Sequence, residues 1–488
     1  MTGGVKSGTT SALEGAFTSF VNAYPAYGRT RSLDDLRARE YRRLDETGHV
    51  YLDYTGGGQY AEQQIQAHIA LLREHVFGNP HSLNPASQSM THLVEQTRGA
   101  ILEFFGASPD EYAAIFTPNA TGALKLVGEA YPFGPGDHYL LTFDNHNSVN
   151  GIREFARAKG AEFTYVPLLL PEMRVDQDYL DRALQRARPG GRNLFAYPAQ
   201  SNFSGVQHPL EWIEWAHDRG WDVVLDAAAF VPTNRLDLGR WKPDFVPVSF
   251  YKMFGYPTGV GCLLARRDAL ARLRRPWFAG GTITVASVRG DRYYLAEGEA
   301  AFEDGTPNYL AIPAVDIGLR HLAGVGLEPI HERVRCLAGW LIGELLAMHH
   351  GTRAPLIRLY GPSGMDHRGG TITMNFYDPQ GRFFDHRLIE REANAVKISL
   401  RTGCFCNPGG GEVALGLDRA ELVACFNQPQ TRLTLDDFRL CIDGKSSGAV
   451  RVSLGLASNF ADVYRFAEFA RGFIDQGVPE RSTWSSRA

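Results

Sequence analysis

The sequence is poor in cysteine, in long apolar runs and in charge of one sign. Six cysteines are scattered over 488 residues, too few and too dispersed for the disulfide scaffold of a small secreted protein. No apolar run approaches the ~18–20 residues that a membrane-spanning helix needs. Lys and Arg number 50 against 54 Asp and Glu, and the basic residues form only short groups, unlike a nucleic-acid surface. We therefore expect a protein of the reducing cytoplasm that binds neither membrane nor nucleic acid.

The rest of the composition is that of an ordinary globular enzyme, with 44% hydrophobic and 21% charged residues. A chain of 488 residues exceeds what one compact core accommodates, so two domains are expected. Short apolar segments between residues 112 and 250 alternate with amphipathic stretches. This alternation predicts an α/β fold, with a mostly parallel sheet covered by helices on both faces.

A smaller α+β domain is expected to follow. A long helical stretch over residues 314–350 leads to strand-like segments at 368–376 and 396–400. We expect a large domain over residues 51–313 and a small domain formed by residues 1–50 and 314–488.

Polar residues stand where several predicted strands end. Because ligands of such sheets bind at the carboxyl ends of the strands, we expect these residues to converge on one site. They are Thr117, Asp144, Gln200, Asp226 and Ser249.

Lys252 and Asp226 are the most informative pair. Asp226 ends an apolar strand, and Lys252 follows in the Gly/Pro-rich turn of residues 249–259. A lysine can bind pyridoxal phosphate (PLP) covalently, and a carboxylate can keep the pyridine nitrogen protonated so that the ring withdraws electrons. An isolated Lys–Asp pair at such turns is usually just solvated, so the prediction of PLP depends on the segments that follow.

Further residues offer contacts to this cofactor. A helix opens at Ala120 after a strand, so its backbone N–H groups and the Thr121 hydroxyl are available to a phosphate; an ordinary N-cap is the alternative. Ser249 and Tyr251 precede the lysine and are candidates for further phosphate contacts. His146 is a candidate for stacking on the pyridine ring and moving a proton, and a structural histidine is the alternative.

Glycine and proline surround Cys404 and Cys406 in residues 401–412. This composition predicts a mobile loop that carries a thiol to a bound substrate. Half a metal site, a vicinal disulfide or two buried cysteines beside a turn are the alternatives. No second Cys/His pair lies near in sequence, and two ligands do not make a zinc site, so no metal is expected. Cys262 stands in an apolar segment and is expected in the core.

Arg451 ends a buried segment near the carboxyl terminus. A guanidinium there suits a bidentate contact to a substrate carboxylate. A structural ion pair is the alternative.

Six segments together resemble class V aminotransferase-fold PLP enzymes, the group that contains the cysteine desulfurases. Within it the sequence is most similar to the NifS-like domain of molybdenum cofactor sulfurases, over roughly residues 35–470. The segments are Gly78-Asn-Pro-His-Ser, Asp144-Asn-His-Asn-Ser-Val, Ser249-Phe-Tyr-Lys-Met-Phe-Gly-Tyr-Pro-Thr-Gly, Phe302-Glu-Asp-Gly-Thr-Pro-Asn, Arg401-Thr-Gly-Cys-Phe-Cys-Asn-Pro-Gly and Gly448-Ala-Val-Arg-Val-Ser. The resemblance implies a fold of PLP type I.

The resemblance also assigns roles. It makes Lys252 the PLP lysine, Cys406 the persulfide-forming cysteine and Arg451, with Arg401, the groups that bind the substrate. Gly305 and Thr306 would reach the phosphate of a partner subunit, which implies a homodimer. The other residues that it places at the cofactor are Ala120, Thr121, His146, Asn202 (at the ring hydroxyl and also at the substrate), Asp226, Ala228, Ser249 and Tyr251.

Three features depart from this family. Ala229 stands where cysteine desulfurases often have a glutamine, and Tyr251 replaces their usual histidine before the lysine. The sequence ends at Ala488, whereas eukaryotic molybdenum cofactor sulfurases continue into a domain that binds the molybdenum cofactor. The resemblance therefore does not extend to the sulfur acceptor.

The expected activity is desulfuration of L-cysteine, which yields alanine and a persulfide on Cys406. Another class V PLP reaction is the first alternative, namely a C–S lyase, selenocysteine lyase, epimerase or aminotransferase, because one fold serves many reactions. A non-catalytic sulfur-carrier subunit is the second, against which the Lys252–Asp226 pair argues.

Overall fold

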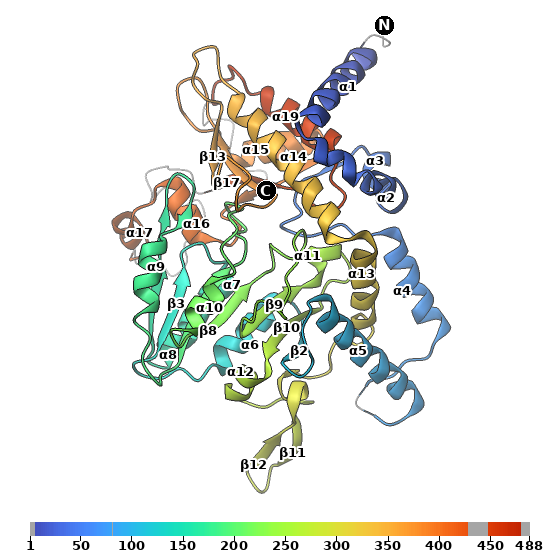
Figure 1. Ribbon diagram of the computed structural model, residues 1–488, viewed down its shortest axis with the longest axis vertical. Helices are drawn as coiled ribbons and strands as arrows, with labels where there is room; N and C mark the ends of the chain where they lie inside the picture. Colours follow the sequence, from blue (N-terminus) through green and yellow to red (C-terminus); the bar gives the residue numbers. More distant parts are fainter. Residues whose placement is uncertain (1–4, 81, 428–447, 480–488) are drawn as a thin grey trace.

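The computed structural model describes residues 5–80, 82–427 and 448–479. Figure 1 shows two parts, one below around a large sheet and one above around a smaller sheet. His81 of the 78–82 motif and Cys441 lie outside the described residues.

The larger part contains a seven-stranded sheet of order β2-β10-β9-β8-β7-β3-β4. Only β10 runs antiparallel to its neighbours β2 and β9, so the predicted mostly parallel sheet is confirmed. Cys262 in β10 is fully buried, as expected. The strands are β2 (Tyr112–Thr117), β3 (His138–Thr142), β4 (Glu162–Val166), β7 (Asn193–Pro198), β8 (Asp222–Asp226), β9 (Phe245–Ser249) and β10 (Gly261–Arg266).

Helices cover both faces of this sheet. Neighbouring strand residues point to opposite faces, so Leu140 and Leu141 of β3 belong to two separate hydrophobic clusters. One cluster is closed by α6 (Ala120–Ala130), α8 (Ile152–Ala158) and α12 (Arg267–Arg272). The other is closed by α5 (Pro85–Phe104), α9 (Gln177–Leu184), α10 (Trp212–His217) and α13 (Ile312–Val325).

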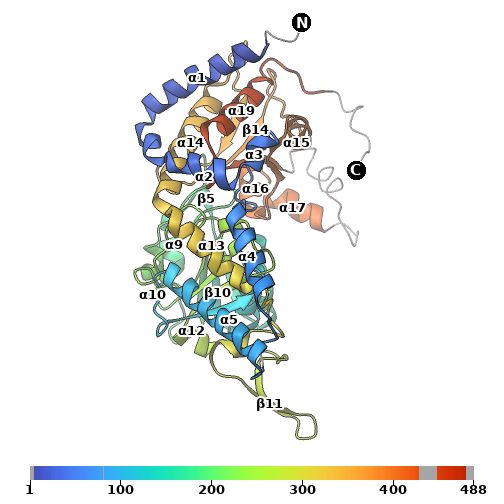
Figure 2. The same cartoon turned by 90° about the vertical axis from the view of Figure 1, so that its right-hand side faces the viewer.

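The smaller part contains a four-stranded antiparallel sheet of order β13-β14-β17-β16. N-terminal helices pack onto its C-terminal helices, and Figure 2 shows α1 beside α14 and α19. The predicted domain boundary falls between residues 50 and 51, which are the two residues of β1, and both pair with β15. The division into domains at this point stays a prediction. The elements are α1 (Val5–Ala23), η1 (Pro25–Thr30), α2 (Ser32–Glu40), α3 (Arg43–Glu46), β1 (Val50–Tyr51), β13 (Ile357–Tyr360), β14 (Thr371–Phe376), α15 (His386–Ala395), β15 (Ile398–Ser399), β16 (Arg401–Gly403), β17 (Ala449–Ser453) and α19 (Phe460–Arg471).

The helical stretch expected over residues 314–350 is present and consists of two helices. Helix α13 ends at Gly326, which has φ of 83°, and α14 (Leu327–Ala347) begins directly after it. A glycine at this left-handed position ends the first helix without the strain that a side chain would bring. Helix α13 packs on α5 in the larger part, and α14 packs on α19 in the smaller part. The chain therefore passes from the larger part to the smaller part at Gly326.

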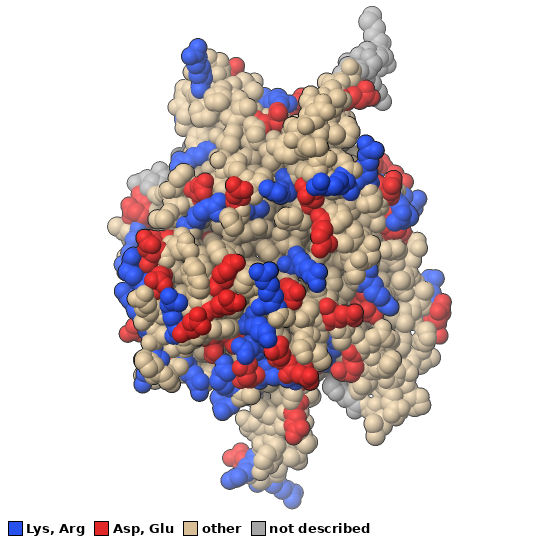
Figure 3. All heavy atoms as spheres, in the orientation of Figure 1, with Lys and Arg blue, Asp and Glu red and all other residues tan. Residues whose placement is uncertain are grey.

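The remaining elements lie around these sheets. The β11–β12 hairpin projects from the lower end of Figure 1. On the face seen in Figure 3, basic and acidic side chains are interspersed. No described helix is long and apolar enough to cross a membrane. Cys425 is disulfide-bonded, whereas Cys262, Cys336, Cys404 and Cys406 are free thiols. The elements are α4 (Glu62–Glu74), α7 (Asn147–Asn150), β5 (Leu168–Leu169), β6 (Arg174–Val175), α11 (Phe250–Phe254), β11 (Ile283–Ser287), β12 (Arg292–Leu295), η2 (Gly298–Phe302), α16 (Pro408–Leu415) and α17 (Arg419–Phe426).

Candidate active site

A cavity of about 190 Å³ lies at the carboxyl ends of strands β7, β8 and β9. Of the residues proposed to contact the cofactor, all but Gly305 and Thr306 line it. The predicted lining residues are Ala120, Thr121, His146, Asn202, Asp226, Ala228, Ser249, Tyr251 and Lys252, and the others are Asn119, Leu124, Ser148, Pro198, Gln200 and Ala229. Of the five strand-end residues expected to converge, Gln200, Asp226 and Ser249 line this cavity, whereas Thr117 lines a neighbouring one and Asp144 accepts a hydrogen bond from His208 instead.

Lys252 and Asp226 share this cavity. Lys252 lies in α11, the short helix that opens directly after β9. Burial lowers the pKa of the Lys252 amine, while the carboxylate of Asp226 opposes that shift. Asp226 ends β8, and its Oδ1 accepts a hydrogen bond of 3.0 Å from the backbone N–H of Ala228. A lysine whose neutral form is favoured is a nucleophile ready for a carbonyl carbon.

The amino end of α6 forms one wall of the cavity. The N–H of Ala120 donates to Ser249 Oγ at 3.0 Å, and the hydroxyls of Thr121 and Ser148 lie 2.8 Å apart. Asn119 caps the helix by accepting from the N–H of Gly122 at 3.0 Å. The N-cap alternative is thus present together with hydroxyl and N–H groups that suit a phosphate. Ser148 was missed from the sequence, although it lies in the motif that contains His146.

His146 caps the short helix α7. Its Nδ1 accepts a hydrogen bond of 3.1 Å from the N–H of Ser148, so the neutral ring carries its proton on Nε2. Burial lowers the pKa of His146, Asp226 opposes this shift, and Lys252 and Arg451 add to it. A neutral imidazole with a fixed tautomer can therefore face the cavity.

Arg451 and Arg401 share one carboxylate, that of Asp53. Arg451 Nη2 donates to Asp53 Oδ1 at 3.0 Å, and Arg401 Nη2 donates to Asp53 Oδ2 at 2.6 Å. Arg451 Nη1 also donates to the carbonyl oxygen of Asn202 at 3.0 Å, and the guanidinium lies 4.6 Å from the ring centre of Phe405. Arg451 therefore forms a buried ion pair, which was the alternative to a substrate-binding role. The sequence did not reveal Asp53, although it follows a strand and precedes three glycines.

The cysteine loop is docked beside the cavity rather than extended. Phe405 and Cys406 have φ of 56° and 55°, so the side chains of Cys404 and Cys406 do not point the same way, as they would in an extended chain. The carbonyl of Cys406 accepts from the N–H of Asn147 at 2.7 Å. Asn202 Nδ2 donates to the carbonyl of Phe405 at 2.8 Å. The thiol of Cys406 interacts electrostatically with Lys252, Arg451 and Arg401.

The glycines after this loop are packed, so the expectation that they make a mobile loop is wrong. Gly409, Gly410 and Gly411 lie buried in the first turn of α16. A Cβ at Gly409 would come within 1.9 Å of the carbonyl oxygen of Phe143, and one at Gly410 within 3.0 Å of the Phe203 ring. The glycines therefore let α16, which follows the cysteine loop, approach Phe143 at the end of β3.

We expect Gly409→Ala to displace α16 and destabilise the protein by about 1–3 kcal/mol, the usual cost of overpacking. Thermal unfolding followed by circular dichroism measures this loss. Gly343→Ala in the interior of α14 is the matched control, because a Cβ there meets nothing within 4 Å. The control should keep or slightly raise the melting temperature, since alanine favours helix. Equal melting temperatures for both variants would contradict the packing role of Gly409.

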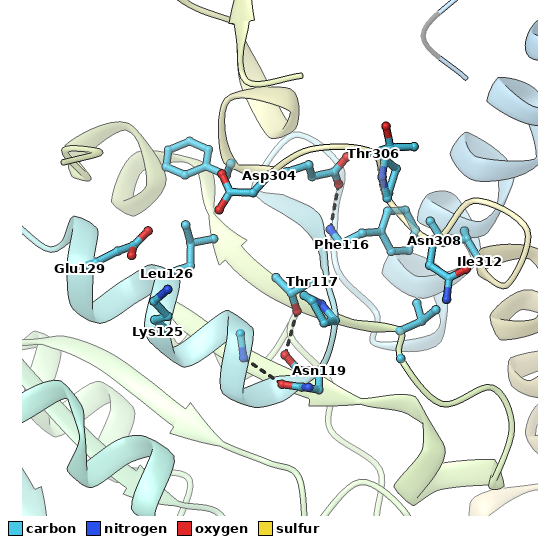
Figure 4. Close-up of a pocket in the computed structure, with 17 residues that line it drawn as sticks. Phe116, Thr117, Asn119, Lys125, Leu126, Glu129, Asp304, Thr306, Asn308 and Ile312 are labelled. Atoms are coloured by element: carbon cyan, nitrogen blue, oxygen red, sulfur yellow. Dashed lines mark hydrogen bonds between the residues drawn. The ribbon is translucent and has the colours of Figure 1, made fainter. Parts of the chain in front are cut away.

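Thr306 lies outside the first cavity. It lines a second cavity of about 530 Å³, shown in Figure 4, together with Lys125 and Glu129 of α6 and with Asn119, which borders both cavities. Thr306 Oγ1 accepts a hydrogen bond of 3.4 Å from Asn79 Nδ2. The roles expected of Gly305 and Thr306 at a partner subunit stay a prediction.

The donor set of the first cavity fits PLP. It combines a buried lysine with a lowered pKa, a carboxylate across from it, and hydroxyl and N–H groups at a helix amino end. These are groups for the aldehyde, the pyridine nitrogen and the phosphate of that cofactor, respectively. Within the described residues, no group of three or more His, Cys, Asp or Glu is arranged to hold a metal ion.

The sheet order, the lysine after β9 and the carboxylate at the end of β8 define an α/β protein of PLP fold type I. The chain belongs to the aminotransferase class-V family, whose model matches residues 50–466.

Curated relatives are longer than this chain. It is 37% identical to molybdenum cofactor sulfurase of Solanum lycopersicum over 484 residues, which cover 93% of this chain and 59% of that protein. It is also 37% identical to molybdenum cofactor sulfurase of Homo sapiens, over 93% of this chain and 52% of that protein. The chain thus spans between half and three-fifths of the length of these relatives.

Solved structures share the fold. A cysteine desulfurase from Thermococcus onnurineus NA1 superposes with a TM-score of 0.73 at 22% identity, over 90% of this chain and 98% of that one. A cysteine desulfurase from Escherichia coli gives 0.71 at 20% identity, over 90% and 97%.

Proposed function

We propose that the protein is a PLP-dependent cysteine desulfurase similar to the desulfurase part of molybdenum cofactor sulfurases. The observation that carries this proposal is the meeting of the Lys252 amine and the Asp226 carboxylate at one cavity, with the loop that carries Cys406 bonded to Asn202 of the cavity wall. The relatives named for sulfuration and desulfuration support it. The lysine and the carboxylate suit PLP, and the added thiol suits sulfur transfer.

The residues of the cavity divide among the parts of the cofactor. Lys252 would bind its aldehyde carbon, Asp226 would hold the proton on its pyridine nitrogen, and Ala120, Thr121 and Ser249 would hold its phosphate. PLP bound there supplies an electron sink for the bonds at the substrate Cα. His146 would lie against the ring, while Ala228 and Tyr251 complete the wall.

Proton transfer falls to Lys252 and His146. The Lys252 amine, whose pKa burial lowers, takes the proton from the substrate Cα, because it is a base in its neutral form. The His146 ring, neutral with its proton on Nε2, can donate and accept protons beside it. Arg451 holds the substrate carboxylate, and its neighbours Arg401 and Asn202 complete that side of the site.

Cys406 performs the sulfur transfer. Its thiolate attacks the sulfur of the substrate cysteine, so a new S–S bond forms while the Cβ–S bond breaks. The electron pair of the broken bond takes up a proton at Cβ, and the products are alanine and a Cys406 persulfide. The reaction converts one thiol and cysteine into one persulfide and alanine, with no outside oxidant. The Cys406 thiol interacts electrostatically with the Lys252 amine and with the guanidinium groups of Arg451 and Arg401.

The test is product analysis with the PLP-loaded protein and L-cysteine. We expect alanine in amounts equal to persulfide sulfur, with sulfide appearing when a reductant is added. Pyruvate and ammonia as products, or transfer of the amino group, would instead indicate another class V PLP reaction.

A second prediction concerns His146 and Asp226. We expect His146→Ala to slow turnover by about 10²-fold, the low end for a general acid–base group. Asp226→Asn should keep the fold and much of the bound cofactor but lose most turnover, because the pyridine nitrogen is no longer held protonated. Steady-state kinetics and the cofactor absorbance measure both effects. Near wild-type rates would contradict these roles.

We also propose a homodimer in which Gly305 and Thr306 of one subunit reach the phosphate site of the other. Thr306 is exposed and lies outside the cavity that would hold the phosphate of its own subunit. Apolar side chains on and near the β11–β12 hairpin support an interface, since exposed apolar patches mark interaction sites. Val288 is 100% exposed and Tyr294 is 63% exposed.

The location that we propose is the cytoplasm.

A further inference from the structure

Asp53 is far in sequence from the residues that it contacts. It lies between β1 and α4. Its Oδ1 accepts a hydrogen bond from the Arg451 guanidinium, and its Oδ2 accepts hydrogen bonds from the Arg401 guanidinium. The Asp53 side chain is 11% exposed and that of Arg451 is 4% exposed. One carboxylate thus neutralises one of two neighbouring cations and leaves the cluster with a single positive charge, suited to a substrate with one carboxylate.

The backbone around Asp53 is built to hold this carboxylate in place. The N–H groups of Gly56 and Gly57 donate to the carbonyl of Asp53 at 2.9 and 3.1 Å. Asp53 also forms a β-bridge with Ser453, two residues beyond Arg451. A Cβ at Gly56 would lie 2.5 Å from Asp53 Oδ2 and 2.6 Å from Arg401 Nη2. The turn therefore closes around the ion pair only because residue 56 has no side chain.

Arg451 retains an unused donor. Asp53 and the carbonyl of Asn202 occupy Nη2 and Nη1, whereas Nε is buried without a hydrogen-bond partner. A buried polar group without a partner is costly, and a ligand oxygen is one way to satisfy it. The ring of Phe405 covers the guanidinium.

We propose that Asp53 is a positioning residue that orients Arg451 toward the α-carboxylate of the substrate and ties Arg401, at the start of the cysteine segment, to the same anchor. The inference rests on the proposed amino acid substrate. Asp53 would not be displaced by that substrate, because the turn, the β-bridge and Arg401 all hold it. Its removal would free the guanidinium to turn and so weaken carboxylate recognition in particular.

The test compares two ligands that differ only in the carboxylate. L-Alanine and L-alaninamide are titrated into the PLP-loaded protein without turnover, and the change in cofactor absorbance gives each Kd. We expect wild type to prefer L-alanine. Asp53→Asn should raise the Kd for L-alanine about ten-fold, as loss of a supporting partner commonly does, and leave that for L-alaninamide within about two-fold. Asp53→Glu keeps the charge, so its Kd for L-alanine should lie between those of wild type and Asp53→Asn. This variant replaces Asp53→Asn in the test if Asp53→Asn does not fold.

Asp34→Asn is the matched control. Asp34 pairs at 2.6 Å with Arg333, another arginine whose side chain is 1% exposed, but in the smaller part away from the cavity. It should lower the melting temperature and leave the ratio of the two Kd values unchanged. An unchanged ratio in Asp53→Asn and Asp53→Glu, tighter L-alanine binding by Asp53→Asn, or equal binding of both ligands by wild type would overturn the role of Asp53. A protein that shows the expected ratios but forms no alanine from cysteine would overturn the desulfurase proposal alone.

Discussion

Lys252→Ala is expected to remove the covalently bound cofactor and to reduce alanine formation from cysteine by at least ~10⁴-fold, the upper end for loss of a proton-transfer group. Two functions are lost together, because the same amine binds the aldehyde carbon of PLP and takes the proton from the substrate. Burial also lowers the pKa of this amine and so favours the neutral form that both functions need. The phosphate contacts of Ala120, Thr121 and Ser249 should still allow PLP to bind weakly.

The measurement is the visible absorbance of the purified protein before and after dialysis. Wild type should be yellow and should keep the band, whereas the variant should lose it. Lys125→Ala is the matched control, because this exposed lysine of α6 lines the neighbouring cavity and not the first one. The control should keep both colour and activity. A Lys252→Ala protein that retains a covalent adduct, on whichever lysine, would refute the assignment.

The central sheet and its cavity could be predicted because the information is local. Each buried strand is a short apolar run, and the rule that ligands bind at the carboxyl ends of strands does not depend on loop detail. Asp226 and Ser249 are the last residues of β8 and β9, so their positions followed from where the apolar runs end. Lys252 follows Ser249 by three residues, so it lies within one helical turn of the end of β9.

Asp53 could not be predicted because its contacts are distant in sequence. It meets Arg451 across 398 residues, through the pairing of the N-terminal segment with β17. No local pattern encodes such a meeting. The polar residue after Val50–Leu52, followed by the glycines at 56–58, was the available signal.

The cysteine loop shows why composition misleads. Glycine is permissive in isolation, so Gly409–Gly411 suggested mobility. Their neighbours in space, Phe143 and Phe203, reverse this interpretation, since the glycines are the places where two elements touch. The left-handed conformations of Phe405 and Cys406 are likewise held by Asn202 and Asn147, which lie on other elements.

Cys406→Ser is expected to end alanine production from cysteine, with a loss of at least ~10³-fold, as removal of a catalytic nucleophile commonly causes. The PLP absorbance should remain, because Lys252, Asp226 and the phosphate contacts are untouched. The thiol of Cys406 interacts electrostatically with Lys252 and with Arg451 and Arg401, the groups proposed to act on the substrate. Serine keeps the size of the side chain but does not form the nucleophilic anion at neutral pH.

Cys404→Ser is the matched control in the same loop. Cys404 is exposed and lies beside Gly411 of α16, and the left-handed turn at residues 405 and 406 separates its direction from that of Cys406. We expect this variant to keep activity within about three-fold, with a lower efficiency of passing sulfur onward. Mass spectrometry after incubation with cysteine should find one added sulfur on Cys406. Sulfur found only on Cys404 would show that Cys404, and not Cys406, is the nucleophile. If both variants retain wild-type rates and alanine is not a product, a C–S lyase or epimerase reaction replaces the desulfurase, because those reactions need Lys252 and Asp226 but no thiol.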